Sequence, residues 1–382
     1  MRKRIANLVK IGGFDNVETV LFGGTTPVVI QTMWKDRLSY ADINGAAGEA
    51  VVARITRLKA MGCGILRFAV PDLEAAEVLG NLAGMVSMPL VADIHFDYKI
   101  ALRCLDFPIA KIRINPGNIG SRDRVEKVLT RAAEKGVPIR IGVNGGSLPQ
   151  DLRRQTDAGE IDRAEALVQA AERELAVFKE FDFTGVLVSM KASSVGETIR
   201  ANRLLAERTD VPLHIGVTEA GPLIAGVTRN AVALHALLSG GIGDTIRVSL
   251  SDTMENEVIA GREILNLASV SVDVSGGDVP AAQSRRTVSE GVTIVSCPRC
   301  GRNGFDTHAF TARWLDHLYT LKKKCTIAIM GCAVNGPEEA RHADLGITGA
   351  GDKVLLFRHG KISRTIDASD ADAAFREELE KL

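Results

Sequence analysis

AKIRINPGNIGSRDRVEKVLTRAAEKGVPIRIGVN, residues 110–144, contains one complete strand–helix–strand unit. Ala110–Asn115 and Pro138–Asn144 are short runs in which isoleucine and valine alternate with polar residues, a pattern that predicts β-strands. Between them, Arg122–Glu134 repeats apolar residues at the helical period. A helix that connects two strands favours parallel pairing, because the chain must return to the starting end of the sheet before the second strand begins.

The same unit repeats on both sides of this stretch. The predicted strands are Val28–Gln31, Ile65–Val70, Leu90–Ile94, Ala110–Asn115, Pro138–Asn144, Val186–Lys191, Pro212–Val217 and Thr245–Leu250. The predicted helices are Gly48–Ala60, Leu73–Leu82, Arg122–Glu134, Ala164–Phe178, Val195–Arg208, Ile224–Leu238 and Met254–Leu267. Eight strands that alternate with helices over about 270 residues predict a TIM-type (β/α)8 barrel, typically ~250 residues long. An open doubly wound sheet is the alternative, but no G-x-G-x-x-G phosphate loop follows the first strand.

The sequence changes character after the last predicted helix. We expect the barrel to occupy residues 1–269, a connection rich in Gly, Ser and Pro to occupy residues 270–291, and a small α/β domain to occupy residues 292–382. In this second domain a helix is predicted over Thr311–Leu321, strands over Thr326–Met330 and Lys353–Arg358, and a last helix from Asp370. A domain this small can gain stability directly from a metal centre.

Composition narrows the class of protein. Lys plus Arg and Asp plus Glu number 47 each, which argues against a general surface for nucleic acid or membranes, and no basic run supplies a local one. We find no signal peptide and no transmembrane helix, and therefore expect a cytoplasmic enzyme. The six cysteines are too sparse for a disulfide framework. Cys63 and Cys104 stand in apolar contexts and are expected to be buried core thiols.

Polar side chains gather near the ends of the predicted barrel strands, where the active sites of such barrels lie. The candidate binding residues are Arg67, Asp93, Arg113, Asn115, Arg140, Asn144, Lys191, His214, Arg247 and Ser249. Four arginines and a lysine that converge on one mouth are costly to bury unpaired. We therefore interpret them as ligands of a highly charged anion, most simply a diphosphate. Alternatively, some of them point outward and pair with helix carboxylates, and Asp93, His95 and His214 either bind a metal or support the site by hydrogen bonds.

The second domain contains the motifs SCPRCGR, residues 296–302, and GCAVNGPEEA, residues 331–340. Cys297 and Cys300 form a C-x-x-C pair, Cys332 follows, and Glu339 comes seven residues later. Three thiolates without an obvious fourth indicate either zinc with a mixed ligand set or an iron–sulfur cluster that holds one iron differently. Cys325 is an alternative third ligand, and His308 or His342 is an alternative partner in a zinc site.

Several long strings in this chain resemble the family of 4-hydroxy-3-methylbut-2-enyl diphosphate synthases. The barrel strings are VADIHFDY (91–98), RINPGNIG (113–120), PIRIGVN (138–144), HIGVTEAG (214–221) and GIGDTIRVSL (241–250); the cluster strings are CPRCGR and GCAVNGPEEA. They run in the family's order over nearly the whole chain and are similar to its shorter, two-domain bacterial form. Two places depart from the family: Glu338 stands where a glycine is usual, and residues 31–36 read QTMWKD where a QSMTNT-like run is usual.

The resemblance implies a function. It is the two-electron reductive ring opening and dehydroxylation of 2-C-methyl-D-erythritol 2,4-cyclodiphosphate in the non-mevalonate route to isoprenoids, with flavodoxin or ferredoxin as the electron donor. It also implies a [4Fe–4S] cluster held by Cys297, Cys300, Cys332 and Glu339, with Glu338 as a minor candidate for the last position. A carboxylate is a harder and more weakly held ligand of cluster iron than a thiolate, which suits an exchangeable, catalytic iron position at Glu339. The family's homodimer, in which the cluster domain of one chain caps the barrel of the other, is a further implication.

Two other hypotheses fit parts of the sequence. One is a barrel synthase or methyltransferase of pterin type whose C-terminal module is a structural zinc site; it predicts a colourless protein that is active without a reductant. The other is a zinc-bound adaptor for nucleic acid or protein, for which an aromatic content of 4% and zero net charge give little support. The C-x-x-x-C-x-x-C sequence of radical S-adenosylmethionine enzymes does not occur.

Overall fold

The computed structural model describes residues 5–95, 97–115, 119–269, 291–298, 304–333 and 336–382. The chain forms two compact units, residues 1–289 and 290–382. The predicted connection, residues 270–291, lies outside the described residues except for Gly291. Among the helices of the described ranges, none has the length and apolar character needed to cross a membrane.

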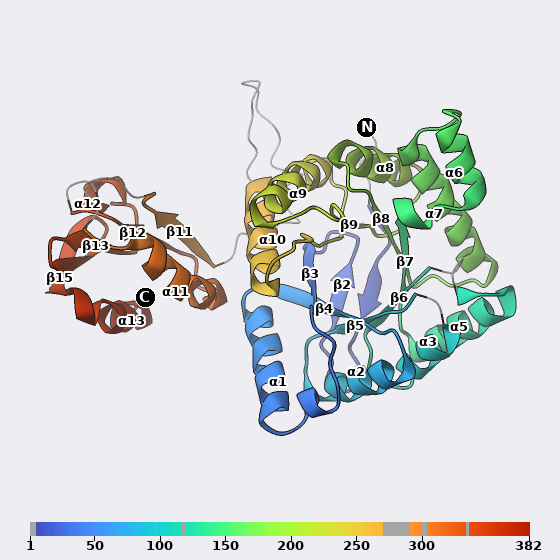
Figure 1. Cartoon of the computed structure of the whole chain (residues 1–382), viewed down its shortest axis with the longest axis horizontal. Coiled ribbons are helices and arrows are strands. Elements are labelled where there is room, and N and C mark those ends of the chain that lie inside the picture. The colour runs from blue at the N-terminus through green and yellow to red at the C-terminus, as the bar shows by residue number, and fades with distance from the viewer. Residues whose placement is uncertain (1–4, 96, 116–118, 270–290, 299–303, 334–335) are drawn as a thin grey trace. The chain divides into compact units, whose positions relative to one another are not determined.

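The first unit is a barrel of eight parallel strands surrounded by helices (Figure 1). The strands are β3 (Val29–Met33), β4 (Cys63–Ala69), β5 (Leu90–Asp93), β6 (Lys111–Ile114), β7 (Ile139–Asn144), β8 (Val186–Lys191), β9 (His214–Ile215) and β10 (Thr245–Ile246). Their order is β8-β7-β6-β5-β4-β3-β10-β9, and a parallel bridge between Val188 and Leu213 joins β8 to the residue before β9. The prediction of a (β/α)8 barrel is confirmed.

The helices follow the strands in the expected alternation. They are α1 (Gly45–Ala60), α2 (Leu73–Met85), α3 (Tyr98–Cys104), α5 (Arg122–Lys135), α6 (Gln150–Asp157), α7 (Arg163–Glu180), α8 (Val195–Arg208), α9 (Leu223–Leu238) and α10 (Met254–Ser269). Side-chain caps fix where several of them begin: Asp72, Asp162 and Ser194 each accept a hydrogen bond from the amide three residues later. Helices α3 and α6 were not predicted, because seven and eight residues are too short to display a helical period.

An N-terminal hairpin, which was also not predicted, covers one end of the barrel. Strands β1 (Val9–Ile11) and β2 (Val20–Phe22) pair antiparallel, and their apolar side chains pack with Ile65, Val91 and Leu187 from barrel strands. These three residues lie below the carboxyl ends of their strands, so the hairpin closes the floor of the barrel. Gly12 ends β1 with φ +64°, and a Cβ there would lie 2.1 Å from the carbonyl oxygen of Glu18. The Gly12-Gly13 pair thus shapes this turn.

The second unit is a mixed five-stranded sheet. Its order is β11 (Val292–Ser296), β12 (Cys325–Met330), β13 (Leu345–Ala350), β14 (Lys353–Arg358) and β15 (Lys361–Asp367). The first three strands are parallel and the last two antiparallel. Helices α11 (Thr307–Thr320) and α13 (Ala371–Glu380) pack on one face, where Phe310, Trp314 and Phe375 form an aromatic cluster. The short helix α12 (Gly336–Glu339) follows β12, and a smaller apolar cluster from Ala328 to Phe357 lies beside it.

Candidate active site

A small polar cavity of about 170 Å³ lies at the carboxyl ends of the barrel strands. The strand ends bring its side chains together because residues two apart on a barrel strand face the same side. Its lining includes eight of the ten predicted binding residues: Arg67, Asp93, Arg113, Arg140, Asn144, Lys191, Arg247 and Ser249. Five cations and one carboxylate therefore share a space large enough for a small anion. His95, Ser189 and Thr218 also line it.

Two predicted binding residues are not on the wall of this cavity. Asn115 directly follows β6 and is buried. His214 opens β9 and is fully buried in the barrel, where its Nδ1 lies 3.3 Å from Thr245 Oγ1. Burial, followed by the charge of Lys191, keeps the pKa of His214 well below its usual range. His214 is therefore a neutral side chain of the barrel interior.

Asp93 is the carboxylate that faces the cavity, and it pairs with two arginines. Arg113 Nη1 donates to its Oδ1 at 3.1 Å, and Arg67 Nε lies 3.5 Å from its Oδ2. Burial alone would raise the pKa of Asp93, but Arg67 and Arg113 outweigh burial and hold that pKa below its usual range. Arg113 Nη1 also donates to His95 Nε2 at 2.6 Å. The ionised carboxylate therefore fixes the guanidinium groups of two cavity-lining arginines.

A glycine makes room for this arrangement. An added Cβ at Gly142 of β7 would lie 2.4 Å from Nε of Arg113, so any larger residue there would displace the guanidinium. Arg113 Nη2 instead reaches the carbonyl oxygen of Gly142 at 3.4 Å. The Gly-Val-Asn sequence at the end of β7 thus combines space for Arg113 with the cavity-lining side chain of Asn144.

A second carboxylate, Glu257 of α10, lies behind the cavity and was not predicted. Its side chain is fully buried and receives hydrogen bonds from Arg247 Nε and Nη2, both at 3.1 Å. Thr32 Oγ1 donates at 2.6 Å, the Leu250 amide donates at 3.1 Å, and Lys35 pairs with it as well. Burial would raise the pKa of Glu257, but Arg247, Lys35 and Thr32 together hold that pKa below its usual value.

Two cavity cations make no such ion pair with the residues that the structure describes. Arg140 and Lys191 are buried, with 2% and 8% of their surfaces exposed, and neither makes a side-chain hydrogen bond or ion pair within the described part of the chain. Burial and the neighbouring cations lower the pKa of both side chains well below the ordinary range. Buried, unpaired cations at a cavity wall are costly unless an anion joins them. The charge distribution of the cavity therefore favours an anion as its ligand.

Lys111 extends the cationic interior below the cavity. It is fully buried, its Nζ lies 3.5 Å from Gln31 Oε1, and it lies 5.0 Å from the ring centre of Phe22 in the N-terminal hairpin. Sequence reasoning did not name Lys111, although it lies two residues before Arg113 and therefore faces the same side of β6. That alternation was the signal that could have found it.

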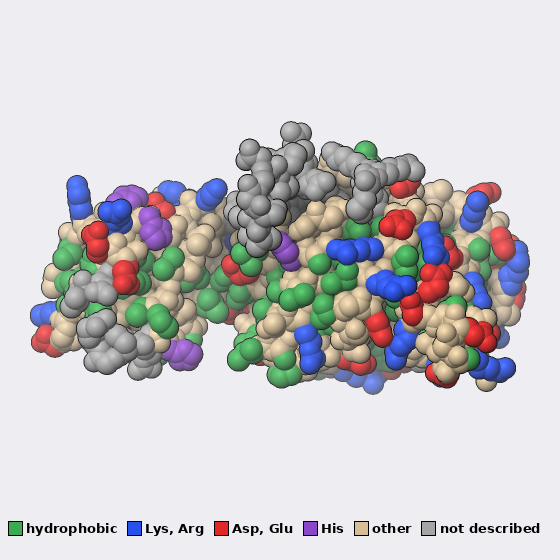
Figure 2. Space-filling view, turned by 90° about the horizontal axis from the view of Figure 1, so that it is seen from above, with side chains coloured by type: hydrophobic (Ala, Val, Ile, Leu, Met, Phe, Trp, Pro, Cys, Tyr) green, Lys and Arg blue, Asp and Glu red, His purple; other side chains and the backbone are tan. Residues whose placement is uncertain are grey.

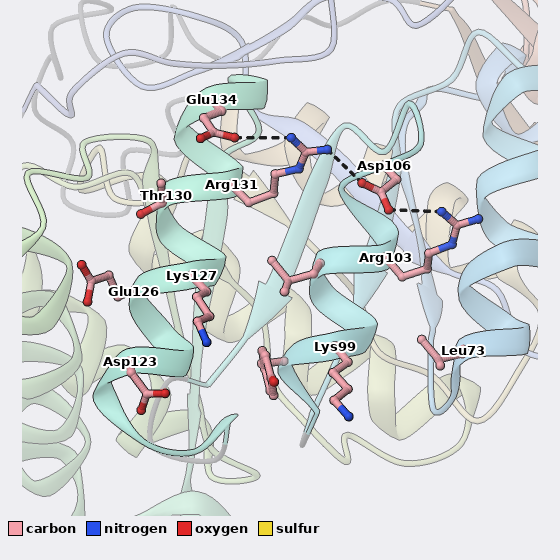
Figure 3. Close-up of a pocket in the computed structure, with 12 residues that line it drawn as sticks. Leu73, Lys99, Arg103, Asp106, Asp123, Glu126, Lys127, Thr130, Arg131 and Glu134 are labelled. Carbon is pink, nitrogen blue, oxygen red and sulfur yellow. Dashed lines mark hydrogen bonds and ion pairs between the residues drawn. The ribbon is translucent and has the colours of Figure 1, made fainter.

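A larger hollow lies on the outside of the barrel between α3 and α5, and its charges are arranged differently. Its volume is about 890 Å³. Arg131 bridges Asp106 and Glu134, and Arg103 pairs with Asp106, so these two arginines already have counter-charges (Figure 3). Acidic and basic side chains are likewise interspersed on the visible face of the barrel unit (Figure 2). Neither surface resembles the cavity with its unpaired cations.

In the second unit, the parallel pairing of β11 and β12 brings two of the predicted metal ligands to one edge of the sheet. Cys297 directly follows β11, and its amide donates to the Ile329 carbonyl at 2.9 Å. Cys332 follows the end of β12, and both cysteines are partly exposed. Cys325 is buried at the opposite end of β12, roughly 16 Å of strand away from the level of Cys297. Cys325 is therefore ruled out as a ligand beside Cys297.

The structure says less about where the other predicted metal ligands lie. Glu338 and Glu339 are both exposed on α12, directly after the Cys332 loop, and Cys300 lies outside the described residues. His308 and His342, the alternative zinc partners, are exposed. Within the described ranges, which omit Cys300, no group of three or more His, Cys, Asp or Glu residues is close enough to hold a metal. Cys63 and Cys104 are buried core thiols, as expected, and burial raises the pKa of each to about 12.

Comparison with solved structures gives only a weak likeness. The 7,8-dihydropteroate synthase of Vibrio fischeri ES114 superposes with a TM-score of 0.46 and 11% identity over 69% of this chain and 100% of that chain. A similarity this low carries no argument about function.

Sequence comparison is far more specific. The relatives include proteins named 4-hydroxy-3-methylbut-2-en-1-yl diphosphate synthase (flavodoxin) from Treponema pallidum, Treponema denticola and Geobacillus thermodenitrificans. They are 50%, 47% and 42% identical and cover 99%, 99% and 96% of this chain and 92%, 99% and 91% of their own lengths. Residues 15–262 match the family model of the GcpE TIM-barrel domain, and residues 293–381 match that of the GcpE protein C-terminal domain. This chain, with its cationic barrel mouth and with Cys297 and Cys332 at one edge of its second sheet, belongs to the GcpE family of 4-hydroxy-3-methylbut-2-en-1-yl diphosphate synthases.

Proposed function

We propose that this chain catalyses the two-electron reductive ring opening and dehydroxylation of 2-C-methyl-D-erythritol 2,4-cyclodiphosphate to 4-hydroxy-3-methylbut-2-enyl diphosphate, with release of water. The carrying observation is the near full-length identity to relatives of that name. The cavity agrees with such a substrate, because two buried cations there, Arg140 and Lys191, make no ion pair with any described residue and a diphosphate supplies a partner. The same activity makes the pterin-type alternative unnecessary.

In this proposal the barrel binds and orients the diphosphate. Arg140 and Lys191 provide unpaired positive charge, and Arg113 and Arg247 present guanidinium groups that carboxylates already hold in place. Asn144 and Ser249 add neutral hydrogen-bonding groups at the same wall. Arginine suits this role because its planar fork can bond two phosphate oxygens at once. Burial has already removed most of the water around these cations, so the negative charge of the substrate takes over the stabilising role that water would have.

The second unit is the proposed site of a [4Fe–4S] cluster held by Cys297, Cys300, Cys332 and Glu339. The donor set fits, because Cys297 and Cys332 lie at the carboxyl ends of neighbouring parallel strands and are partly exposed, and thiolates are the ligands that cluster iron prefers. When bound, the cluster supplies the two electrons of the reaction, one at a time. Glu339 follows Cys332 closely enough in the chain for both to serve one centre.

We further propose flavodoxin as the electron donor, because the relatives' names specify it. A cytoplasmic location suits the free thiols of Cys63, Cys104 and Cys325. We propose a homodimer as the active form. Mixing an inactive Lys191→Met chain with an inactive Cys332→Ser chain tests it: recovered turnover supports sites assembled from two chains.

The proposed function is tested by anaerobic purification followed by turnover with reduced flavodoxin and the cyclic diphosphate. We expect a brown protein with about four irons per chain, and water and the linear diphosphate as products. A colourless protein with one zinc per chain, or activity that needs no reductant, would contradict the proposal.

A further inference from the structure

We infer that Glu257 is a positioning residue for the diphosphate site: through Arg247 it aims one guanidinium into the cavity. This inference rests on the proposed function of the cavity. Glu257 itself does not line the cavity, whereas Arg247 does. Any effect of Glu257 on the ligand must therefore pass through the residues that it holds.

Glu257 binds only one edge of the Arg247 guanidinium. Nε and Nη2 donate to the two carboxylate oxygens, both at 3.1 Å. The remaining terminal nitrogen, Nη1, donates to Met33 Sδ at 3.6 Å and makes no contact with Glu257, and Arg247 as a whole lines the cavity. A paired grip of this kind fixes the plane of the guanidinium as well as its position. The edge that carries Nη1 is then the one left to meet a diphosphate oxygen in the cavity.

Glu257 is itself held rigidly. Thr32 at the end of β3 donates to one oxygen at 2.6 Å, and the Leu250 amide donates to the other at 3.1 Å. Lys35, just after β3, pairs with the same carboxylate and donates to the Leu250 carbonyl at 3.0 Å. One buried carboxylate thus ties β3, the segment after β10 and α10 together at the rim of the cavity.

The same helix offers a matched control. Glu255 is also buried, and it is gripped in the same paired way, but by Arg54 of α1 at 3.0 and 3.1 Å and by Arg57 at 3.0 Å. None of these three residues lines the cavity. Replacing either glutamate removes one buried, arginine-bound carboxylate from α10, but only Glu257 is connected to the cavity.

The sign of the effect separates positioning from simple electrostatics. Glu257 is negative and close to the cavity, so a Glu257→Gln change would by charge alone strengthen the attraction for an anion. If Glu257 positions Arg247, the same change weakens binding, because the guanidinium loses the partner that fixes its plane. The two explanations thus predict opposite shifts in affinity.

The experiment is calorimetric titration of inorganic diphosphate into the anaerobically prepared, cluster-loaded full chain. We expect Glu257→Gln to weaken binding about tenfold and Glu255→Gln to leave it unchanged. Thr32→Val, which removes one donor to Glu257 and no charge, should weaken binding about threefold and remains informative if Glu257→Gln does not fold. In turnover, Glu257→Gln should raise KM more than it lowers kcat, because Arg247 holds a group that is present in both substrate and product.

A double-mutant cycle completes the test. In an Arg247→Ala background, Glu257→Gln should no longer weaken diphosphate binding, because only its small charge effect, which favours the anion, remains. The inference is overturned if Glu257→Gln and Thr32→Val bind diphosphate as well as or better than the parent protein, or if Glu257→Gln weakens binding fully without Arg247. In either case, binding of diphosphate by the parent protein still supports the proposed function. Failure of the parent protein itself to bind diphosphate instead overturns the cavity assignment and the inference together.

Discussion

Arg113 and Asp93 are register partners on the neighbouring strands β6 and β5, and their side chains meet in a hydrogen bond of 3.1 Å at the cavity wall. Both side chains are at least nine-tenths buried. Arg67 shares the same carboxylate, so one negative charge serves two arginines. This pairing explains how the barrel retains Arg67 and Arg113 at its mouth.

The first prediction concerns that carboxylate. Asp93→Asn should lower the free energy of unfolding by about 3 kcal/mol, because two buried guanidinium groups lose their counter-charge. Urea denaturation of the full chain measures the change. The control is Asp106→Asn, which removes a carboxylate that also binds two arginines but is 39% exposed, and which should cost much less. Equal losses in the two variants would contradict the explanation.

The second prediction is that Lys191 lowers the stability of the ligand-free protein but is needed to bind diphosphate. Lys191→Met should raise the free energy of unfolding of the ligand-free protein by about 1–2 kcal/mol, because a buried ammonium without a partner is replaced by an apolar chain of similar size. The same variant should lose diphosphate binding and turnover. Thermal unfolding and titration with inorganic diphosphate measure the two effects. A destabilised Lys191→Met chain would indicate that the ammonium has a partner in the ligand-free state.

The third prediction is a pH dependence that arises at Glu255. Burial would raise the pKa of this carboxyl, but Arg54 and Arg57 outweigh burial and lower that pKa from 4.5 to about 2. A carboxyl with a depressed pKa stabilises the fold above its unfolded-state pKa and loses that contribution as the pH falls. About 3 kcal/mol should therefore disappear between pH 4.5 and pH 2.

Unfolding by urea between pH 6 and pH 2 tests this prediction. In Glu255→Gln the stability at pH 6 should already be lower, and its decline on acidification should be shallower than in the parent chain. Parallel curves for the two proteins would show that other carboxylates carry the acid sensitivity.

Most of the barrel could be predicted from sequence because six of its eight strands are long enough to show their pattern. Val186–Lys191 was predicted with the observed bounds, and the other predicted strands overlap observed ones. The predictions for β9 and β10 ran past the two residues that pair, because the residues that follow continue the apolar pattern without a ladder. The three-residue strands of the N-terminal hairpin, by contrast, are too short for any period, and only packing against Ile65 and Val91 defines them.

Some residues of the candidate site could likewise be predicted from the sequence, and others could not. Arg67, Arg113 and Arg140 could be found because each stands at a fixed parity near a strand end. Glu257 could not, because in Met254-Glu-Asn-Glu257 it looks like the other acids of an amphipathic helix, and only the tertiary contacts with Arg247 and Thr32 reveal its burial. In the second unit, β11 was not predicted, because its five residues, between a Gly- and Ser-rich stretch and the cysteine motif, are too few to show a clear period.

The fourth prediction separates ligand cysteines from the core cysteine. Cys297→Ser and Cys332→Ser should each lose most of the iron, because both thiols lie at the edge where β11 and β12 end. Cys325→Ser, at the buried start of β12, should retain about four irons per chain and lose only some stability. Iron analysis and the visible absorption spectrum of anaerobic samples give the answer. Iron loss in Cys325→Ser alone would reverse the assignment.

The fifth prediction distinguishes two adjacent carboxylates. Glu338 and Glu339 are both exposed on α12, and Glu338 lies 3.5 Å from Arg341 one turn later, an ion pair that already gives it a surface role. Glu339→Ala should reduce turnover below about 1% of the parent rate while inorganic diphosphate still binds with unchanged affinity, because the barrel cations are untouched. Glu338→Ala should stay close to the parent in both measurements. Full turnover by Glu339→Ala would contradict its role as a ligand. If Glu338→Ala were the inactive variant instead, the carboxylate ligand would have to be moved one residue back, to the position that carries the unusual glutamate of this chain.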